Sequence, residues 1–147
     1  MRMVIQRVKH ASVTVDGKIT GKIGQGFLVL LGIGPDDTEE IAEKMADKMM
    51  RLRIFSDEND KINRSLSDVD GELLLVSQFT LYADIKSRRP GFTKAAPPAV
   101  AIPLYETFLD LCRARGFQVE HGAFGADMAV QSVNDGPVTI WMDTETL

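Results

Sequence analysis

The sequence predicts one α+β domain in which two main helices pack on a curved, mostly antiparallel β-sheet. Three observations lead to this prediction. Apolar and polar residues alternate near both ends of the chain, which is typical of strands with one solvated face. A continuous apolar run at 26–34 and a second, strongly apolar segment at 71–84 are typical of strands covered on both faces. Two other segments carry apolar residues at helical spacing, which predicts amphipathic helices.

The chain begins with strands. Alternation over 3–8 and again over 12–15 predicts two of them. The Asp-Gly sequence at 16–17 is a hairpin signal, so the chain is expected to return in a short strand over 18–23. The run over 26–34 is bounded by glycines and predicts a central strand.

The first helix is predicted to follow this central strand. Asp37 is expected to cap it, and Ile41, Met45 and Met49 recur at helical spacing. After the helix, residues 53–63 predict a short strand and a polar turn.

The second half of the chain again places a helix after a buried strand. A buried strand over 71–84 precedes a loop over about 83–98, and a loop of this length is usually functional or disordered. The second helix is expected over about 100–115, with Pro103 in its first turn and Gly116 as its stop signal. Strands at about 118–120, 128–133 and 138–142 complete the sheet.

Length and composition limit the possible classes. A chain of 147 residues is long enough to bury a core, so one domain spanning 1–147 is expected. The hydrophobic share of 44% and charged share of 26% are typical of a folded soluble protein. The N-terminus does not resemble a signal peptide, and no apolar run approaches the roughly 20 residues of a membrane span, so a cytoplasmic protein without membrane partners is expected. A single cysteine, Cys112, excludes an internal disulfide, and we predict neither a metal site nor a cofactor.

The net charge of −4 argues against indiscriminate nucleic-acid binding, which needs a broad positive surface. A local basic patch is still possible, because Lys86, Arg88, Arg89 and Lys94 fall within nine residues. This cluster has two interpretations: a solvated loop kept soluble by its charges, or a phosphate-binding loop.

The chain has few residues suited to acid–base catalysis near neutral pH. It contains only two histidines, His10 and His121, and neither belongs to a recognisable motif. Polar residues do interrupt the buried strand abruptly at Ser77, Gln78 and Thr80. They must find hydrogen-bond partners at the strand end or face a pocket, because an unpaired buried polar group costs about 1 to 3 kcal/mol. In a pocket, backbone N–H groups at this turn are candidates for an oxyanion hole. Thr80 is also a candidate nucleophile, although no neighbouring base is evident.

A second unusual motif, VNDGPVT, occupies residues 133–139. Asn-Asp-Gly is a hairpin-turn signal, and the proline that follows removes a backbone donor and restrains the glycine before it. Local rules therefore predict a tight turn, with a cis Gly-Pro bond as an unusual option.

Four motifs together resemble those of the D-aminoacyl-tRNA deacylase (D-tyrosyl-tRNA deacylase) family. They are SQFTLYAD at 77–84, RRPGFTKAAPP at 88–98, FGADM at 124–128 and NDGPVT at 134–139. The N-terminal segment is also similar to that family, so the resemblance covers essentially the whole chain.

The resemblance implies an enzyme that hydrolyses the ester between a D-amino acid and the 3′-terminal ribose of tRNA, and that also removes mischarged glycine. It implies a homodimer with active sites at the interface. Gly136 and Pro137 would form a Gly-cisPro pair inserted into the partner's pocket, where their carbonyls leave no room for an L side chain.

The same resemblance assigns the ester and the terminal adenosine to the SQFTL turn. Ser77, Gln78 and Phe79 would shape the pocket and the oxyanion site. Thr80 would be either a nucleophile or a positioning residue beside a water that is assisted by the 2′-hydroxyl of the RNA. The basic cluster defined above would contact phosphates of the acceptor stem.

Two other functions remain open at this point. One is an esterase or amidase that acts on small molecules with Thr80 as nucleophile. The other is a dimeric RNA-binding module without catalysis, which would bind tRNA in a salt-sensitive way and leave the aminoacyl group in place.

Overall fold

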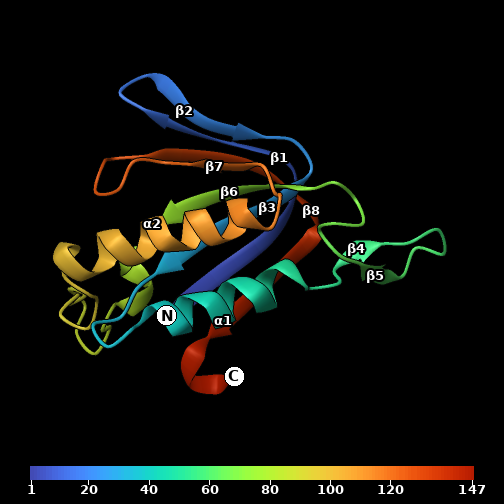
Figure 1. Ribbon diagram of the computed structural model, residues 1–147. Helices are drawn as coiled ribbons and strands as arrows, with labels where there is room; N and C mark the ends of the chain where they lie inside the picture. The colour runs from blue at the N-terminus through green and yellow to red at the C-terminus, as the bar shows by residue number, and fades with distance from the viewer.

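Both main helices cover one face of a curved six-stranded sheet in the computed structural model, which describes residues 1–147 (Figure 1). This arrangement confirms the predicted α+β fold with two main helices. The sheet is formed by β1 (Arg2–Val15), β2 (Lys18–Ile23), β3 (Gly26–Gly32), β6 (Glu72–Ser77), β7 (Val119–His121) and β8 (Ala129–Asp143). The other elements are α1 (Glu39–Met50), α2 (Pro98–Ala114), the hairpin of β4 (Phe55–Ser56) and β5 (Ile62–Arg64), and the 3₁₀ helices η1 (Phe79–Tyr82) and η2 (Thr144–Thr146).

The sheet is mixed. Strand β1 pairs antiparallel with β2, β3 and β8, as predicted for the ends of the chain. The pairs β3–β6 and β6–β7 are parallel, which the sequence analysis did not predict. Parallel neighbours need a crossover connection, and α1 and α2 provide these two crossovers, so both helices lie on the same face.

The sheet curves until its ends nearly meet. Strand β2 lies against β6 and β7 although it is hydrogen-bonded only to β1. A Cβ atom on Gly21 would lie 2.7 Å from the carbonyl oxygen of His121, so glycine permits this close approach of β2 to β7.

Helix α1 begins one residue later than predicted. Thr38 is its N-cap and accepts a hydrogen bond from the N–H of Ile41. Asp37, the predicted cap, instead accepts bonds from the N–H of Gly34 at 2.7 Å and from the terminal amine of Met1 at 2.8 Å. The charged amine is the stronger partner for a carboxylate, which explains why the shorter Thr38 side chain caps the helix.

Three further boundaries differ from the predictions. The two expected N-terminal strands form the single long strand β1. The buried strand expected over 71–84 ends at Ser77, after which the chain turns into η1. Helix α2 begins at Pro98, so Pro103 lies inside it, beyond the first turn.

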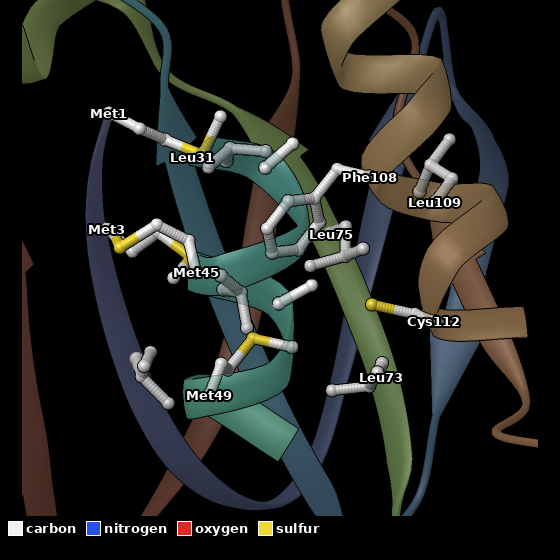
Figure 2. Close-up of a cluster of buried hydrophobic side chains, with 14 of the residues drawn as sticks. Met1, Met3, Leu31, Met45, Met49, Leu73, Leu75, Phe108, Leu109 and Cys112 are labelled. Carbon is white, nitrogen blue, oxygen red and sulfur yellow. The ribbon is translucent and has the colours of Figure 1, made fainter. Parts of the chain in front are cut away.

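The main core lies between the two helices and the sheet (Figure 2). Met45 and Met49 of α1 and Phe108 of α2 meet the apolar side chains of the central strands, among them Leu31 and Leu75. Cys112 is fully buried in the same cluster. A smaller cluster fills the inside of the curve around Val13, Leu28 and Leu74, among other residues. No helix is long and apolar enough to span a membrane.

Candidate functional site

The SQFTL segment lies at the carboxyl end of β6, next to β3. Ser77 is the last residue of the strand. The N–H of Gln78 still bonds the carbonyl oxygen of Leu31 at 2.8 Å, and the next turn is 3₁₀, with the N–H of Leu81 bonded to the carbonyl oxygen of Gln78 at 3.2 Å. The carboxyl ends of parallel strands are common positions for ligand sites, because the chain leaves the sheet there.

A pocket of about 230 Å³ opens at this strand end. One wall comes from Ser77, Gln78 and Phe79, and the opposite wall comes from the turn after β7 and the start of β8. The complete lining is Val76, Ser77, Gln78, Phe79, Phe124, Gly125, Ala126, Met128 and Val130. The polar interruption of the buried strand therefore does coincide with a pocket.

Thr80 does not line this pocket. Its side chain is exposed, and its hydroxyl oxygen accepts a hydrogen bond from the side-chain amide of Gln78. The structure thus brings together three of the four predicted residues of this motif and places the fourth on the outside of the turn.

No residue that lines the pocket has a titratable side chain. His10 is exposed on β1. His121 lines a larger depression of about 570 Å³ beside α2, and this depression shares only Phe124 with the Ser77 pocket. Neither histidine therefore lines the Ser77 pocket of its own chain, where a general base would have to reach the ligand.

Unpaired backbone N–H groups, beside the side chains of Ser77 and Gln78, are donors that the site offers for a negative charge. Phe79 and Thr80 begin η1, and the first N–H groups of a helix have no acceptor within it. Gln78, at the N-cap position, makes no side-chain capping bond. Of these two residues only Phe79 lines the pocket, so its N–H group is suited to stabilise an oxyanion there.

Sequence reasoning assigned no role to Phe124, Gly125, Ala126 and Met128, which form the second wall. The signal was present, because these residues belong to the FGADM motif of the resemblance. Polar side chains do not reveal this wall, because it is apolar and is shaped by a turn in which Gly125 has φ of 76°.

Arg2 connects η1 to both terminal segments of the chain. Its Nη1 donates to the carbonyl oxygen of Leu81 at 2.9 Å, and its Nε donates to the carboxylate of Asp143 at 3.2 Å. Its guanidinium lies 4.4 Å from the centre of the Tyr82 ring. Burial raises the pKa of Tyr82 well above its ordinary value, so its hydroxyl stays protonated beside Asp37.

The NDGPVT segment is a bulge inside β8, so the predicted tight turn between two strands is wrong. Gln6 pairs with Thr139 and Val8 pairs with Asn134, so Arg7 alone faces residues 135–138. The side chain of Asn134 accepts a hydrogen bond from the N–H of Val138 at 2.8 Å. The strand can therefore continue in its original direction, because side chains replace the missing ladder bonds.

The peptide bond between Gly136 and Pro137 is cis, the isomer that the resemblance implied. Both residues are exposed and neither lines the Ser77 pocket of the same chain. A single chain therefore does not bring the SQFTL and NDGPVT motifs together.

The basic cluster lies in an exposed loop with a defined shape. Asp84 and Gly91 form an isolated bridge with backbone bonds of 2.7 and 2.9 Å. Lys94 pairs with Asp84 at 3.7 Å. Lys86, Arg88 and Arg89 are exposed and make no ion pair, so they are available to phosphates.

Comparisons with known proteins agree over the whole chain. A family model described as D-Tyr-tRNA(Tyr) deacylase matches residues 4–143. The D-aminoacyl-tRNA deacylase of Thermosipho africanus is 56% identical over 146 residues, which are 99% of this chain and 98% of that protein. The protein of the same name from Thermomicrobium roseum is 57% identical and covers 100% of this chain and 96% of its own length.

Two solved structures share the fold. One, named c-Myc DNA Unwinding Element Binding Protein, has a TM-score of 0.92 and 42% identity, and the match covers 98% of this chain and 99% of that chain. The other, described as a probable eukaryotic D-amino acid tRNA deacylase, has a TM-score of 0.84 over 96% of this chain and 97% of that chain. Its identity of 21% supports a likeness of fold alone.

Proposed function

Because the chain belongs to the D-Tyr-tRNA(Tyr) deacylase family and is a hydrolase of ester bonds, we propose that its Ser77 pocket holds the 3′ end of a D-aminoacyl-tRNA. Water cleaves the ester between the amino acid and the terminal ribose, and a free D-amino acid and tRNA are released. Mischarged glycyl-tRNA is a second substrate, since glycine has no side chain to exclude. This activity belongs in the cytoplasm, where tRNA is charged.

The observation that carries this mechanism is a pocket without titratable side chains beside the uncapped start of η1. An aminoacyl ester is already activated, so the site needs oxyanion stabilisation more than a strong base. The N–H group of Phe79, which lines the pocket, supplies this stabilisation when water attacks the carbonyl carbon. The neighbouring 2′-hydroxyl of the ribose relays the proton of the water to the departing 3′ oxygen, so the C–O bond breaks without a protein base.

Chirality is selected by a second copy of the chain in a homodimer. Gly136 and Pro137 are exposed on the bulge of β8 and do not line the pocket of their own chain. We place them across a dimer interface, in the partner's pocket, where their carbonyl oxygens face the substrate α-carbon. An L side chain would meet these oxygens, whereas the hydrogen of a D residue fits.

The same pocket argues against a small-molecule esterase that uses Thr80 as nucleophile. Thr80 lies outside the pocket, its hydroxyl is engaged by Gln78, and the pocket contains no base to activate it. A module that only binds nucleic acid is the second candidate, and the name of one structural relative, c-Myc DNA Unwinding Element Binding Protein, favours it.

One experiment separates these functions: matched D- and L-aminoacyl-tRNA are incubated with the protein, and release of the amino acid is followed. We expect rapid release from the D substrate and no acceleration for the L substrate. Equal hydrolysis of both, or of neither, would contradict the proposal. A binding module would retain both substrates in a salt-sensitive complex without hydrolysis.

A separate measurement tests the cross-subunit role. Sedimentation at micromolar concentration should give twice the mass of one chain. A monomer that still discriminates D from L substrates would contradict the placement of Gly136 and Pro137 in a partner's pocket.

A further inference from the structure

Two aromatic rings lie in contact between the pocket and the basic loop. Phe79 lines the pocket and remains 55% exposed, and Phe92 follows the basic residues and remains 39% exposed. The two rings meet edge to face, with centroids 5.1 Å apart and planes at 77°. In this geometry each ring contacts the other through one edge or one face, so aromatic surface stays open to a ligand.

The loop places Phe92 at a defined position. The backbone bridge between Asp84 and Gly91 closes the loop immediately before Phe92. The position therefore depends on hydrogen bonds that are independent of the aromatic contact. Phe92 and Phe79 are both exposed and in contact, so together they form an apolar surface patch, which is a feature typical of a binding site.

The charge around the ring is positive. Lys86, Arg88 and Arg89 are exposed and unpaired in the segment that leads to Phe92. The nearest acid in this segment, Asp84, is already occupied by Lys94 and by the N–H of Lys86 at 3.0 Å. An exposed ring beside unpaired cations is the combination that binds single-stranded nucleic acid, because bases stack on the ring while cations hold the backbone.

We propose that Phe92 is the stacking platform for the nucleotide that precedes the terminal one in the single-stranded 3′ end of the substrate. This inference rests on the proposed function, which places the terminal nucleotide and its ester at the pocket beside Phe79. A strand that leaves the pocket toward the cations passes the next ring, and that ring is Phe92. Stacking tolerates any base, so the platform positions the strand without reading its sequence.

The test compares two substrates that differ only in the upstream nucleotides: D-aminoacyl-tRNA and the D-aminoacyl ester of adenosine. Phe92→Leu keeps an apolar side chain of similar size and removes the aromatic face, whereas Phe92→Trp enlarges that face. Ile85→Ala is the matched control, because Ile85 is 78% exposed in the same loop and is not aromatic.

For Phe92→Leu we expect KM for D-aminoacyl-tRNA to rise roughly 5-fold to 150-fold, the range given by loss of one stacked base. The kcat for that substrate and both constants for the adenosine ester should stay unchanged. Phe92→Trp and Ile85→Ala should behave like the unaltered protein. Equal losses on both substrates would overturn the proposal, because Phe92 would then act only by orienting Phe79. No loss on either substrate would overturn it as well.

A binding measurement tests the stacking role of Phe92 independently of hydrolysis. An RNA hairpin with a single-stranded 3′ end and 2-aminopurine in the penultimate position should lose fluorescence with the unaltered protein, through stacking, and much less with Phe92→Leu at saturating protein. Equal fluorescence with the two proteins would overturn the stacking platform. Failure of the unaltered protein to hydrolyse either ester would instead contradict the proposed function.

Discussion

Arg7 on β1 donates a hydrogen bond from Nε to the carbonyl oxygen of Asp135 on β8, at 2.8 Å, where the bulge that carries Gly136 and Pro137 begins. Its Nη1 donates to the carbonyl oxygen of Ile54 at 2.6 Å, and its side chain is only 9% exposed. One buried guanidinium therefore joins the bulge to the segment that precedes the β4–β5 hairpin.

Replacing this guanidinium should destabilise the protein. Arg7→Met leaves two carbonyl groups without their charged donor, and we expect the free energy of unfolding to fall by about 3 kcal/mol. Urea denaturation would measure this loss. The control is Arg51→Met, since the side chain of Arg51 is 76% exposed in its ion pair with Asp47 and its removal should cost less than about 1 kcal/mol. Equal effects of the two substitutions would show that the buried bonds of Arg7 contribute nothing particular.

Arg2 should affect turnover more than substrate binding. Its bond to the carbonyl oxygen of Leu81 and its contact with Tyr82 hold η1, which presents the proposed oxyanion donor, the N–H of Phe79. Arg2→Met should lower kcat roughly 10-fold or more with little change in KM, because small displacements of positioned groups slow the reaction. Steady-state kinetics with D-aminoacyl-tRNA would test this, and Arg2→Lys should recover part of kcat because a lysine also donates to a carbonyl oxygen. A change confined to KM would contradict this role.

Thr80→Val should leave substantial activity. The hydroxyl lies outside the pocket, so its removal should reduce kcat/KM for D-aminoacyl-tRNA by less than about tenfold, whereas loss of a true nucleophile abolishes covalent catalysis. Single-turnover hydrolysis is the appropriate measurement, with Thr80→Ser as the control that keeps a hydroxyl. Abolished turnover of Thr80→Val, together with an acyl-enzyme trapped on the unaltered protein, would establish the nucleophile mechanism instead.

The basic residues of the loop should contribute unequally to tRNA affinity. Arg88→Ala and Arg89→Ala should each reduce the slope of log K against log salt by about 0.7 to 1, which is the effect of losing one phosphate contact. Lys94→Ala should change the slope less, because Lys94 pairs with Asp84. Binding measured between about 50 and 200 mM salt gives these slopes. An equal or larger effect at Lys94 would contradict the assignment.

Cys112 should make stability depend on pH in the alkaline range. Burial raises the pKa of its thiol from 9.0 to about 12 in the folded protein. The folded state thus retains a proton that the unfolded state releases, so this contribution is fully present below pH 9 and is lost between pH 9 and 12. For this one group, the free energy of unfolding falls by at most about 1.4 kcal/mol per pH unit.

Burial also raises the pKa values of Tyr82 and Tyr105. Both tyrosines are present in Cys112→Ala, so comparison with this variant isolates the effect of the thiol. The stability advantage of the unaltered protein over Cys112→Ala should shrink as pH rises above 9. Urea denaturation of both proteins at several pH values would show it, and a constant difference would contradict the buried-thiol assignment.

The sequence by itself determined the fold class, most elements and the family, because these depend on local patterns. Helical spacing located α1 and α2, and continuous apolar runs located β3 and β6. The predicted boundaries of elements were wrong where a distant group competed with a local rule. Asp37 lost its role as helix cap because the terminal amine of Met1 lies beside it, and no local pattern contains that contact.

Only the tertiary structure decided what the two unusual motifs become. Local rules made NDGPVT a turn, yet pairing with β1 and the bonds of Arg7 keep it within one strand. Local rules could not decide whether Ser77 finds hydrogen-bond partners at the strand end or faces a pocket. The pocket depends on the wall around Phe124, which is distant from Ser77 in the sequence. Backbone propensity acts over a few residues, whereas a pocket or a bulge exists only when segments distant in sequence meet, and this is why the structure was needed to describe them.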